Sequence, residues 1–327
     1  MNLMQRLGMC FLLCLSITYF AHPLPAHAQS TNNASGIETR ADAWWTGPML
    51  ANSAETLPPG HFLFEPYLYD VSSTPADSFG SRAYVLYGLA DRFTVGMIPI
   101  VGYNRVSNGP SSSGVQMGDL ILQAQYRLTQ FHEGSSMPTI ALQLQETLPT
   151  GKYDRLGSRP SNGVGSGSYS TTLGINSQTY FWLPNGRILR MRFNVTQSFS
   201  RSANVTGVSV YGTDAAFRGN AKPGSAFYAN AAWEYSLTQR WVLALDAIYS
   251  HNHNTRVSGY DVLGIGSTQD APRVRFNSGS SAAFGFAPAI EYSWTPNLGV
   301  LLGSRFILGG HRSHSSITPA IAINYVH

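Results

Sequence analysis

Most of this chain alternates apolar and polar residues at every second position, in segments of about ten residues. In residues 189–198 (LRMRFNVTQS), leucine, methionine, phenylalanine and valine fall on one face, and two arginines, asparagine and threonine fall on the other. The same pattern recurs in residues 119–127, 140–147 and 227–237. Because successive side chains of a strand point to opposite faces, we expect strands with one apolar face and one polar face.

Segments of this kind follow one another after residue 60, and about twelve strands are predicted. They lie near residues 61–69, 80–89, 93–103, 117–128, 138–148, 169–182, 188–199, 226–237, 241–250, 281–294, 298–308 and 315–326. Their connections alternate between tight turns, at 90–92, 184–186, 238–240 and 295–297, and long loops rich in Gly, Ser and Asn, at 104–116, 150–168, 200–225 and 251–280. This difference between the two ends is typical of a bacterial outer-membrane barrel.

The composition narrows the fold class further. Only 12% of the residues are charged, against roughly 25% in an ordinary soluble domain. Beyond the first 28 residues the chain has no uninterrupted apolar run of the ~20 residues that a membrane helix needs. A soluble sandwich or propeller, the rival fold, would show no systematic difference in turn length between its ends. The predicted fold is all-β: a single transmembrane, antiparallel up-and-down β-barrel of about 12 strands.

Aromatic residues gather near the predicted strand ends, as they do in the two girdles of a barrel at the lipid–water interfaces. On the short-turn side they are Phe62, Phe93, Trp182, Trp233, Tyr235, Trp241, Tyr292 and Trp294, and on the long-loop side Tyr103, Tyr169, Phe199, Phe227, Tyr249 and Phe306. The alternative is that aromatic residues are common in any β-sheet. The girdle interpretation places the short turns and the long loops on opposite sides of a membrane.

The amino terminus has the pattern of a secretory signal peptide over residues 1–28. Residues 9–20 are apolar and follow an early arginine, and residues 26–28 (AHA) supply a small-x-small cleavage site. Cys10 and Cys14 lie within this segment. After cleavage the chain therefore has no cysteine for a disulfide, for thiol catalysis or for a metal site.

The rest of the chain is predicted to divide into two parts. Residues 29–60 form a periplasmic N-terminal segment, and residues 61–327 form the outer-membrane β-barrel. A segment of about 30 residues is too short for a separate plug domain. We expect this segment, with Trp44 and Trp45, to insert partway into the periplasmic mouth.

Ten charged residues, five of each sign, are predicted to face the barrel interior. They are Arg82, Arg127, Arg190, Arg192, Arg305, Glu65, Asp119, Glu234, Asp246 and Glu291. Arg190 and Arg192 occupy adjacent alternate positions on one strand, so their fields reinforce each other in a low-dielectric wall. We expect this pair to set the ion selectivity of a pore. The alternative is that the facing charges are structural pairs that hold a narrow barrel rigid.

Other functions find weaker support in the sequence. No catalytic, cofactor-binding or metal-ligating residue is predicted, and no cofactor. An outer-membrane lipase needs an outward serine near a histidine, and the nearest candidates are Ser315 and His314. His251 and His253 are interpreted as solvated loop histidines. A receptor or adhesin that displays its long loops is a further alternative. The net charge of +4 is too small to indicate a nucleic-acid partner.

Four short motifs carry a resemblance to a known family. They are residues 44–48 (WWTGP), 57–67 (LPPGHFLFEPY), 88–93 (GLADRF) and 148–153 (LPTGKY). In these, and over most of the processed chain, the protein resembles the outer-membrane transporters named after the MetA (meta-cleavage) pathway of phenol degradation. The resemblance implies a passive transporter for small aromatic or otherwise hydrophobic compounds. One departure is the carboxyl end, residues 325–327 (YVH), where barrels commonly finish on an outward aromatic.

The sequence as a whole predicts a channel of the bacterial outer membrane. It would pass small solutes by passive diffusion and would not be an enzyme. The expected partners are outer-membrane lipid, small-molecule solutes and the barrel-assembly machinery, with no nucleic acid.

Overall fold

Almost all regular structure in the protein is β. The computed structural model describes residues 37–73, 76–262 and 271–327, so the predicted signal peptide lies outside the described residues. The strands are β1 (Phe62–Ser73), β2 (Ala76–Ala90), β3 (Phe93–Ile98), β4 (Ile100–Val106), β5 (Gln116–Met117), β6 (Leu120–Thr129), β7 (Thr139–Leu148), β8 (Ser170–Trp182), β9 (Ile188–Ser200), β10 (Ala203–Thr206), β11 (Phe217–Lys222), β12 (Ala226–Ser236), β13 (Trp241–Asn252), β14 (Arg256–Asp261), β15 (Arg273–Asn277), β16 (Ser281–Thr295), β17 (Leu298–Gly309) and β18 (Ser316–Val326). Two 3-10 helices, η1 (Arg40–Asp42) and η2 (Pro160–Asn162), complete the described elements. Within this part of the chain, no helix is long and apolar enough to cross a membrane.

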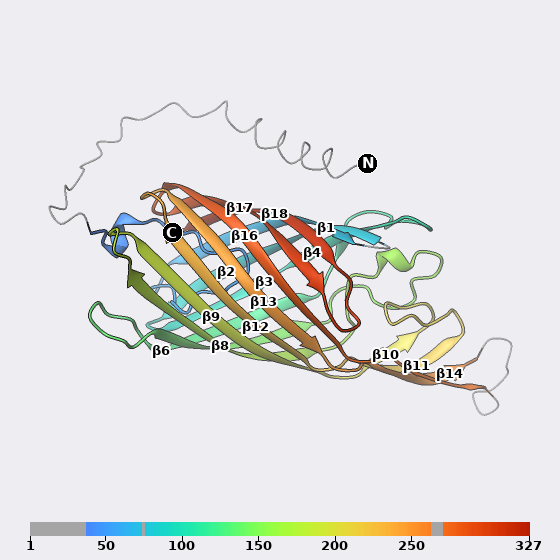
Figure 1. Cartoon of the computed structure of the whole chain (residues 1–327). Helices are drawn as coiled ribbons and strands as arrows, with labels where there is room; N and C mark the ends of the chain where they lie inside the picture. Colours follow the sequence, from blue (N-terminus) through green and yellow to red (C-terminus); the bar gives the residue numbers. More distant parts are fainter. Residues whose placement is uncertain (1–36, 74–75, 263–270) are drawn as a thin grey trace. The chain divides into compact units, whose positions relative to one another are not determined.

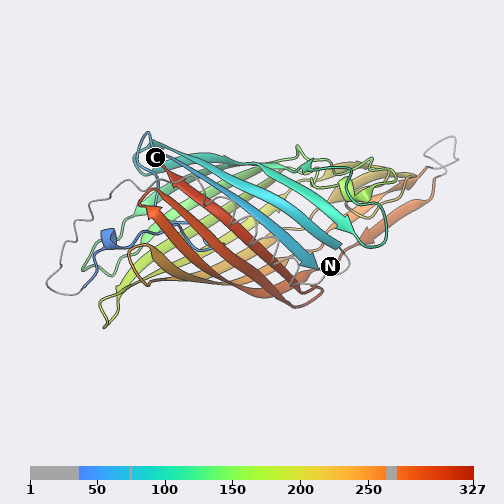
Figure 2. The same ribbon diagram turned by 90° about the horizontal axis from the view of Figure 1, so that it is seen from above.

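Twelve antiparallel strands close into a barrel (Figure 1). Around the wall the order is β1, β2, β3 with β4, β6, β7, β8, β9, β12, β13, β16, β17 and β18, and β1 pairs with β18 to close it. β3 and β4 form one wall strand that is interrupted at Pro99, a residue without an N–H to donate. The strands run obliquely around the wall (Figure 2). The predicted all-β, up-and-down barrel of about 12 strands is confirmed.

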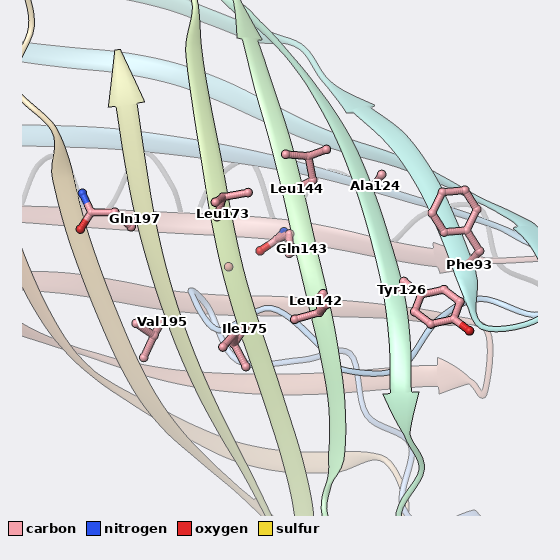
Figure 3. Close-up of a pocket in the computed structure, with 11 residues that line it drawn as sticks. Phe93, Ala124, Tyr126, Leu142, Gln143, Leu144, Leu173, Ile175, Val195 and Gln197 are labelled. Atoms are coloured by element: carbon pink, nitrogen blue, oxygen red, sulfur yellow. The ribbon is translucent and has the colours of Figure 1, made fainter.

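The outer wall is apolar because alternate side chains point outward. On β8, Leu173 and Ile175 are 53% and 54% exposed, whereas Asn176 is fully buried. Figure 3 shows a shallow depression in this wall, lined mainly by apolar side chains of β6, β7, β8 and β9 such as Leu142 and Leu144. An apolar outer surface of this kind fits lipid acyl chains. The depression therefore belongs to the membrane-facing wall and not to the barrel interior. A closed β-barrel with an apolar outer wall is typical of the bacterial outer membrane, and the protein is located there.

Aromatic rings contact one another at both ends of the wall. Near the long loops, the ring centroid of Tyr249 lies 6.3 Å from that of Phe227 and 4.7 Å from that of Phe284. Near the short turns, the rings of Trp241 and Tyr292 lie 4.6 Å apart. Such contacts between neighbouring strands form the interfacial girdles expected for a membrane barrel.

The closing seam joins the first and last wall strands. Phe62 and His327 exchange backbone hydrogen bonds of 3.3 and 2.9 Å, and their rings stack with centroids 5.4 Å apart. Tyr325 points outward, 37% exposed, with its ring 5.7 Å from that of Phe62. Tyr325 thus stands where barrels commonly place their outward terminal aromatic.

Two of the predicted long loops are partly ordered as strands, which the sequence analysis did not predict. Residues 200–225 contain β10 and β11, and residues 251–280 contain β14 and β15. These strands form a separate antiparallel sheet in the order β10, β11, β14, β15. The sheet lies beyond the barrel, at the end opposite the carboxyl terminus (Figures 1 and 2). We call it the outer sheet.

Candidate functional site

A stretch of chain that precedes the first wall strand lies inside the barrel. We call residues 44–57 the inserted segment. It enters beside the short turns, where the Trp44 N–H donates to the Gln239 carbonyl at 2.8 Å. It returns to the wall where the Leu57 N–H donates to Thr94 Oγ1, also at 2.8 Å. Between these points it pairs with no strand, so side chains of the inner wall must satisfy its backbone groups.

Two carboxylates of the wall bind backbone N–H groups of the inserted segment. Glu291 Oε2 accepts from the Thr46 N–H and Oγ1, both at 2.8 Å, and from the Gly47 N–H at 3.1 Å. Asp246 Oδ1 accepts from the Ala51 N–H at 3.0 Å. Gly47 has a φ of +119°, which a residue with a Cβ adopts only under strain. The sharp bend at Gly47 therefore lets two successive N–H groups reach one carboxylate oxygen.

The far end of the segment carries its own acid, Glu55. Its carboxylate accepts from Arg127 Nη1 at 2.9 Å and from Thr139 Oγ1 at 3.1 Å. Gln125 Nε2 donates to the carbonyls of Ser53 and Glu55 at 3.1 and 3.0 Å. The inserted segment is thus fixed to β6 and β7 on one side and to β13 and β16 on the other, and it crosses the interior.

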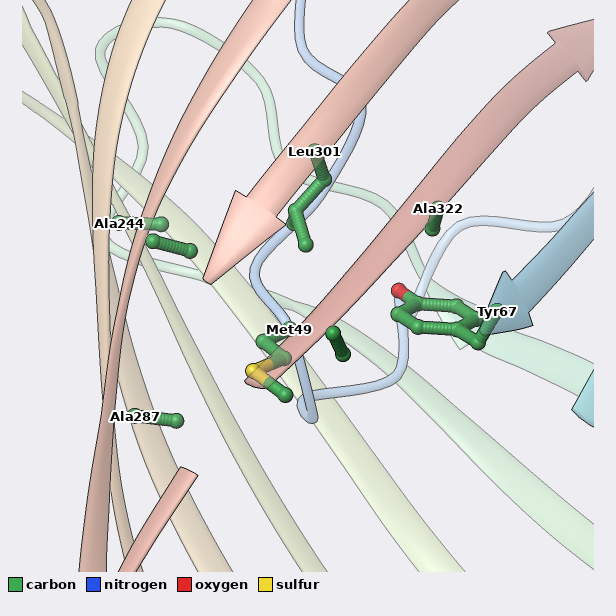
Figure 4. Close-up of a cluster of buried hydrophobic side chains, with 8 residues drawn as sticks. Met49, Tyr67, Ala244, Ala287, Leu301 and Ala322 are labelled. Atoms are coloured by element: carbon green, nitrogen blue, oxygen red, sulfur yellow. The ribbon is translucent and has the colours of Figure 1, made fainter. Parts of the chain in front are cut away.

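Met49 makes an apolar contact between the segment and the wall. It packs in a buried cluster with Tyr67 and Leu301 (Figure 4). The rest of this cluster is small: Ala244, Ala287, Ala289, Ala320 and Ala322. Methyl groups on the facing strands leave room for the thioether, so the segment approaches this side of the wall closely.

The predicted selectivity pair, Arg190 and Arg192, shares one counter-ion. Arg190 donates from Nε to Glu234 at 2.7 Å and from Nη2 to the other oxygen, and Arg192 Nε lies 3.1 Å from the same carboxylate. Arg192 Nη1 also donates to the Ala51 carbonyl at 2.9 Å. The ring of Trp45 lies 4.6 Å from the Arg190 guanidinium carbon. These contacts are those of the alternative interpretation, in which facing charges are structural pairs.

The remaining predicted acids have local partners on the inner face. Glu65 accepts from Asn324 Nδ2 at 3.0 Å. Asp119 accepts from the Gly151 N–H at 3.0 Å and from the Ser166 N–H at 2.8 Å, so it ties a long loop to the barrel rim. Asp119 therefore acts at the long-loop end, away from the inserted segment.

Arg82 and Arg305 differ from the other inward arginines. Arg82 is exposed and lies beside Tyr84 on β2, and Arg305 is within electrostatic range of Tyr228. Arg305 Nη2 is 3.4 Å from Thr318 Oγ1, one inward position closer to the long loops than the alanines around Met49. Among the described residues, neither arginine forms an ion pair with an acid. They add two positive charges to the inner face of the barrel.

Sequence reasoning missed the buried amides that line the wall. Gln143 Nε2 donates to Gln123 Oε1 at 3.0 Å, Asn176 Nδ2 donates to Gln125 Oε1 at 2.9 Å, and Asn194 Nδ2 donates to Asn176 Oδ1 at 2.8 Å. The alternation already placed these amides on the polar faces. They were not among the predicted site residues because those were all charged side chains.

The serine and histidine residues of the alternative sites lie in the long loops or at their edges. Ser315 and His314 are exposed in the loop between β17 and β18. The rings of His251 and His253 lie 4.7 Å apart. The described residues contain no group of three or more His, Cys, Asp or Glu side chains arranged to hold a metal ion.

Known structures share this architecture. The COG4313 outer membrane channel from Pseudomonas putida F1 aligns over 85% of this chain and 100% of its own, with a TM-score of 0.61 and 14% identity. The NanC porin (80% and 98% covered, TM-score 0.43, 9% identity) and the transport unit of the autotransporter AIDA-I from Escherichia coli (85% and 93%, TM-score 0.47, 12% identity) are more distant barrels. At these identities the likeness concerns the fold alone.

Sequence comparison identifies the family. No curated protein sequence matches the chain. A family profile matches residues 47–309, from the bend of the inserted segment to the end of β17. The matched stretch therefore includes every wall strand except β18 and most of the segment that crosses the interior, and the chain belongs to the family described as "Putative MetA-pathway of phenol degradation".

Proposed function

We propose that the protein is a passive channel for small solutes, and that the solute path runs past the inserted segment. One observation carries this proposal: the interior is polar, and the segment that crosses it is held by side chains instead of being built into the sheet. A polar interior is typical of barrels that conduct. The segment narrows the path, so only small molecules would pass.

The interior chemistry favours small aromatic acids and phenols as solutes. The family description refers to phenol degradation. Tyr84 and Tyr228 offer rings for stacking, and Arg82 and Arg305 offer guanidinium groups that pair with a carboxylate or a phenolate. Rings beside unpaired cations would attract an anionic aromatic solute more than a neutral sugar or a cation.

We also propose how the chain sits in the membrane. Residues 1–28 would be cleaved, residues 29–60 would belong to the periplasmic side, and residues 61–327 would form the barrel. The short turns would be periplasmic, as in other outer-membrane barrels. The outer wall would contact outer-membrane lipid, and the barrel-assembly machinery would insert the chain.

A second candidate function is display of the outer sheet to an external partner without transport. The ordered strands β10, β11, β14 and β15 favour it, because a folded surface beyond the barrel is suited to recognition. An enzymatic role has no comparable support.

Single-channel conductance in planar bilayers tests the channel proposal. The purified protein, refolded and verified by heat-modifiable migration, should give stable conductance steps. Benzoate or phenol added to one side should reduce or modulate these steps, and glucose at the same concentration is the control. A correctly folded barrel with no conductance would reject the channel and favour the display function.

A test of the charge argument follows in the same assay. Arg82→Gln with Arg305→Gln should weaken the effect of benzoate more than that of neutral phenol. The matched control is Arg105→Gln with Arg155→Gln, which removes two exposed arginines outside the proposed path. Equal loss for both solutes, or equal loss in the control, would remove these two arginines from the path.

A further inference from the structure

One face of the outer sheet carries a dense array of basic residues. Cross-strand pairing sets Lys222 opposite Arg256, and it sets Arg218 in one row with Tyr260 and Arg273. Between these rows, Arg275 pairs with Ser258. The five cations, Arg218, Lys222, Arg256, Arg273 and Arg275, are all exposed. We call this surface the basic face.

The opposite face of the outer sheet is already occupied. Val205, Phe217, Ala221 and Val257 form a buried cluster against Tyr153 and Tyr211 of neighbouring loops. The Tyr211 hydroxyl donates to the Ser166 carbonyl, and Ser166 in turn binds Asp119 on the inner side of the barrel rim. The buried face thus looks toward the barrel mouth. The basic face looks away from the mouth, as the outer wall does.

The described strand positions on the basic face include no acid. Its other positions in the three longer strands are Asn220, Ser258, Tyr260 and Asn277, which are neutral. Within the described part of the chain, none of the five cations forms an ion pair with an acid. Five neighbouring like charges raise one another's energy, so the surface is suited to an anionic partner.

The location of the basic face identifies the kind of partner. β10, β11, β14 and β15 are chain neighbours of the wall strands β9, β12, β13 and β16, which carry the girdle rings Phe227, Tyr249 and Phe284. Lys222 precedes Phe227 by five positions. At about 3.3 Å per residue and a strand tilt of about 40°, the first cations stand ~13 Å beyond the girdle. This is the level of the polar headgroups of the outer leaflet.

We propose that the basic face binds the phosphate groups of the phosphorylated glycolipid in the outer leaflet around the barrel. Arginine, which supplies four of the five cations, pairs with phosphate through two parallel N–H bonds. Neighbouring strands are about 4.8 Å apart, and alternate residues about 6.7 Å apart. The cations therefore form an array, not a pocket, and it suits a headgroup with several phosphates better than a single free anion.

Co-purification of glycolipid tests this inference. The full-length protein is reconstituted with equal amounts of phosphorylated lipopolysaccharide and its dephosphorylated form, extracted in mild detergent, and the retained glycolipid is measured by mass spectrometry. The phosphorylated form should be retained preferentially, and rising salt should release it. Equal retention of both forms would overturn the proposal.

The variant is Arg256→Gln with Arg273→Gln and Arg275→Gln. Its retention of the phosphorylated form should fall roughly tenfold to hundredfold. The matched control, Arg105→Gln with Arg155→Gln and Arg201→Gln, removes the same charge from other exposed positions and should retain the glycolipid. Heat-modifiable migration and conductance verify that both variants fold. Undiminished retention by the triple variant, or its loss in the control, would contradict the proposal.

Nucleic acid is the competing anionic partner. A short DNA duplex should bind the wild-type protein no better than it binds the triple variant. Binding of the duplex that the variant alone abolishes would assign the basic face to nucleic acid and overturn the glycolipid proposal.

Discussion

At the scale of single residues, Glu234 is the shared counter-ion of two buried arginines. Its carboxylate is fully buried and contacts both Arg190 and Arg192, whose side chains are 8% and 7% exposed. Removing one partner of a buried ion pair leaves the other charge uncompensated, which costs more than the pair contributes. The inner wall is therefore more sensitive to loss of Glu234 than to loss of an exposed acid.

Glu234→Gln should lower the free energy of unfolding by roughly 3–5 kcal/mol. Urea titration of the barrel in lipid vesicles measures this change. The control is Glu146→Gln on β7, where the acid accepts one hydrogen bond from Thr171 at 2.6 Å and where about 1 kcal/mol is expected. Similar losses in both variants would show that Glu234 is an ordinary hydrogen-bond acceptor.

Arg190 and Arg192 carry a prediction about ion selectivity. Arg190→Gln with Arg192→Gln leaves Glu234 without its cations and beside Glu291, so the interior gains negative charge. The reversal potential in a salt gradient should shift toward cation selectivity. An unchanged reversal potential would show that these side chains do not face the conduction path.

At the scale of elements, the position of the inserted segment depends on small residues in the wall that let it approach closely. A Cβ at Gly299 on β17 would lie 2.1 Å from Thr46 Cγ2, so any larger residue there must displace the segment. Gly102 on β4 faces no such restriction, because a Cβ there would meet its nearest atom, Val164 Cγ1, at 3.5 Å. The two glycines form a matched pair for testing what the segment does.

Gly299→Val should increase single-channel conductance, because it displaces the segment without changing charge. Gly102→Ala should leave conductance as it is. The same bilayer recordings measure both. If Gly299→Val folds and conducts like the wild type, the segment does not limit the path.

The wall strands were predictable from the sequence because alternation and turn length act locally. The strand predicted near 93–103 is split at Pro99, and the one near 117–128 is preceded by the short β5. The first break is the consequence of a single residue, Pro99, and the second falls at Gly118 and Asp119 between β5 and β6. The outer sheet was not predictable, since its strands are four to six residues long and are stabilised by packing against Tyr153 and Tyr211.

The site was predictable only in part, for a related reason. Alternation predicts inward positions for the ten charged residues. It gives no information about which of them contact each other or the inserted segment. Glu291 and Thr46 are 245 positions apart, and only the closed barrel brings them together.

At the scale of the whole molecule, the lipid-facing wall tolerates no charge near its middle. Ile175 on β8 pairs with Leu142 and Val195 of the neighbouring strands, all on the outer face. Ile175→Arg should lower the free energy of unfolding by roughly 2–4 kcal/mol. The control is Gln239→Arg, in an exposed short turn. Equal stability of both variants, measured by urea titration in vesicles, would place Ile175 outside the hydrocarbon layer.

The contacts of the inserted segment also fix the order in which the protein is assembled. Ala51 binds Asp246, 195 positions later, and Thr46 binds Glu291. The segment is synthesised before the wall, but the acceptors of Thr46 and Ala51 exist only after β13 and β16 have joined the sheet. Contacts that close such long loops form slowly. We therefore expect the half of the segment that contains Thr46 and Ala51 to dock late in biogenesis, after the half that binds β6 and β7.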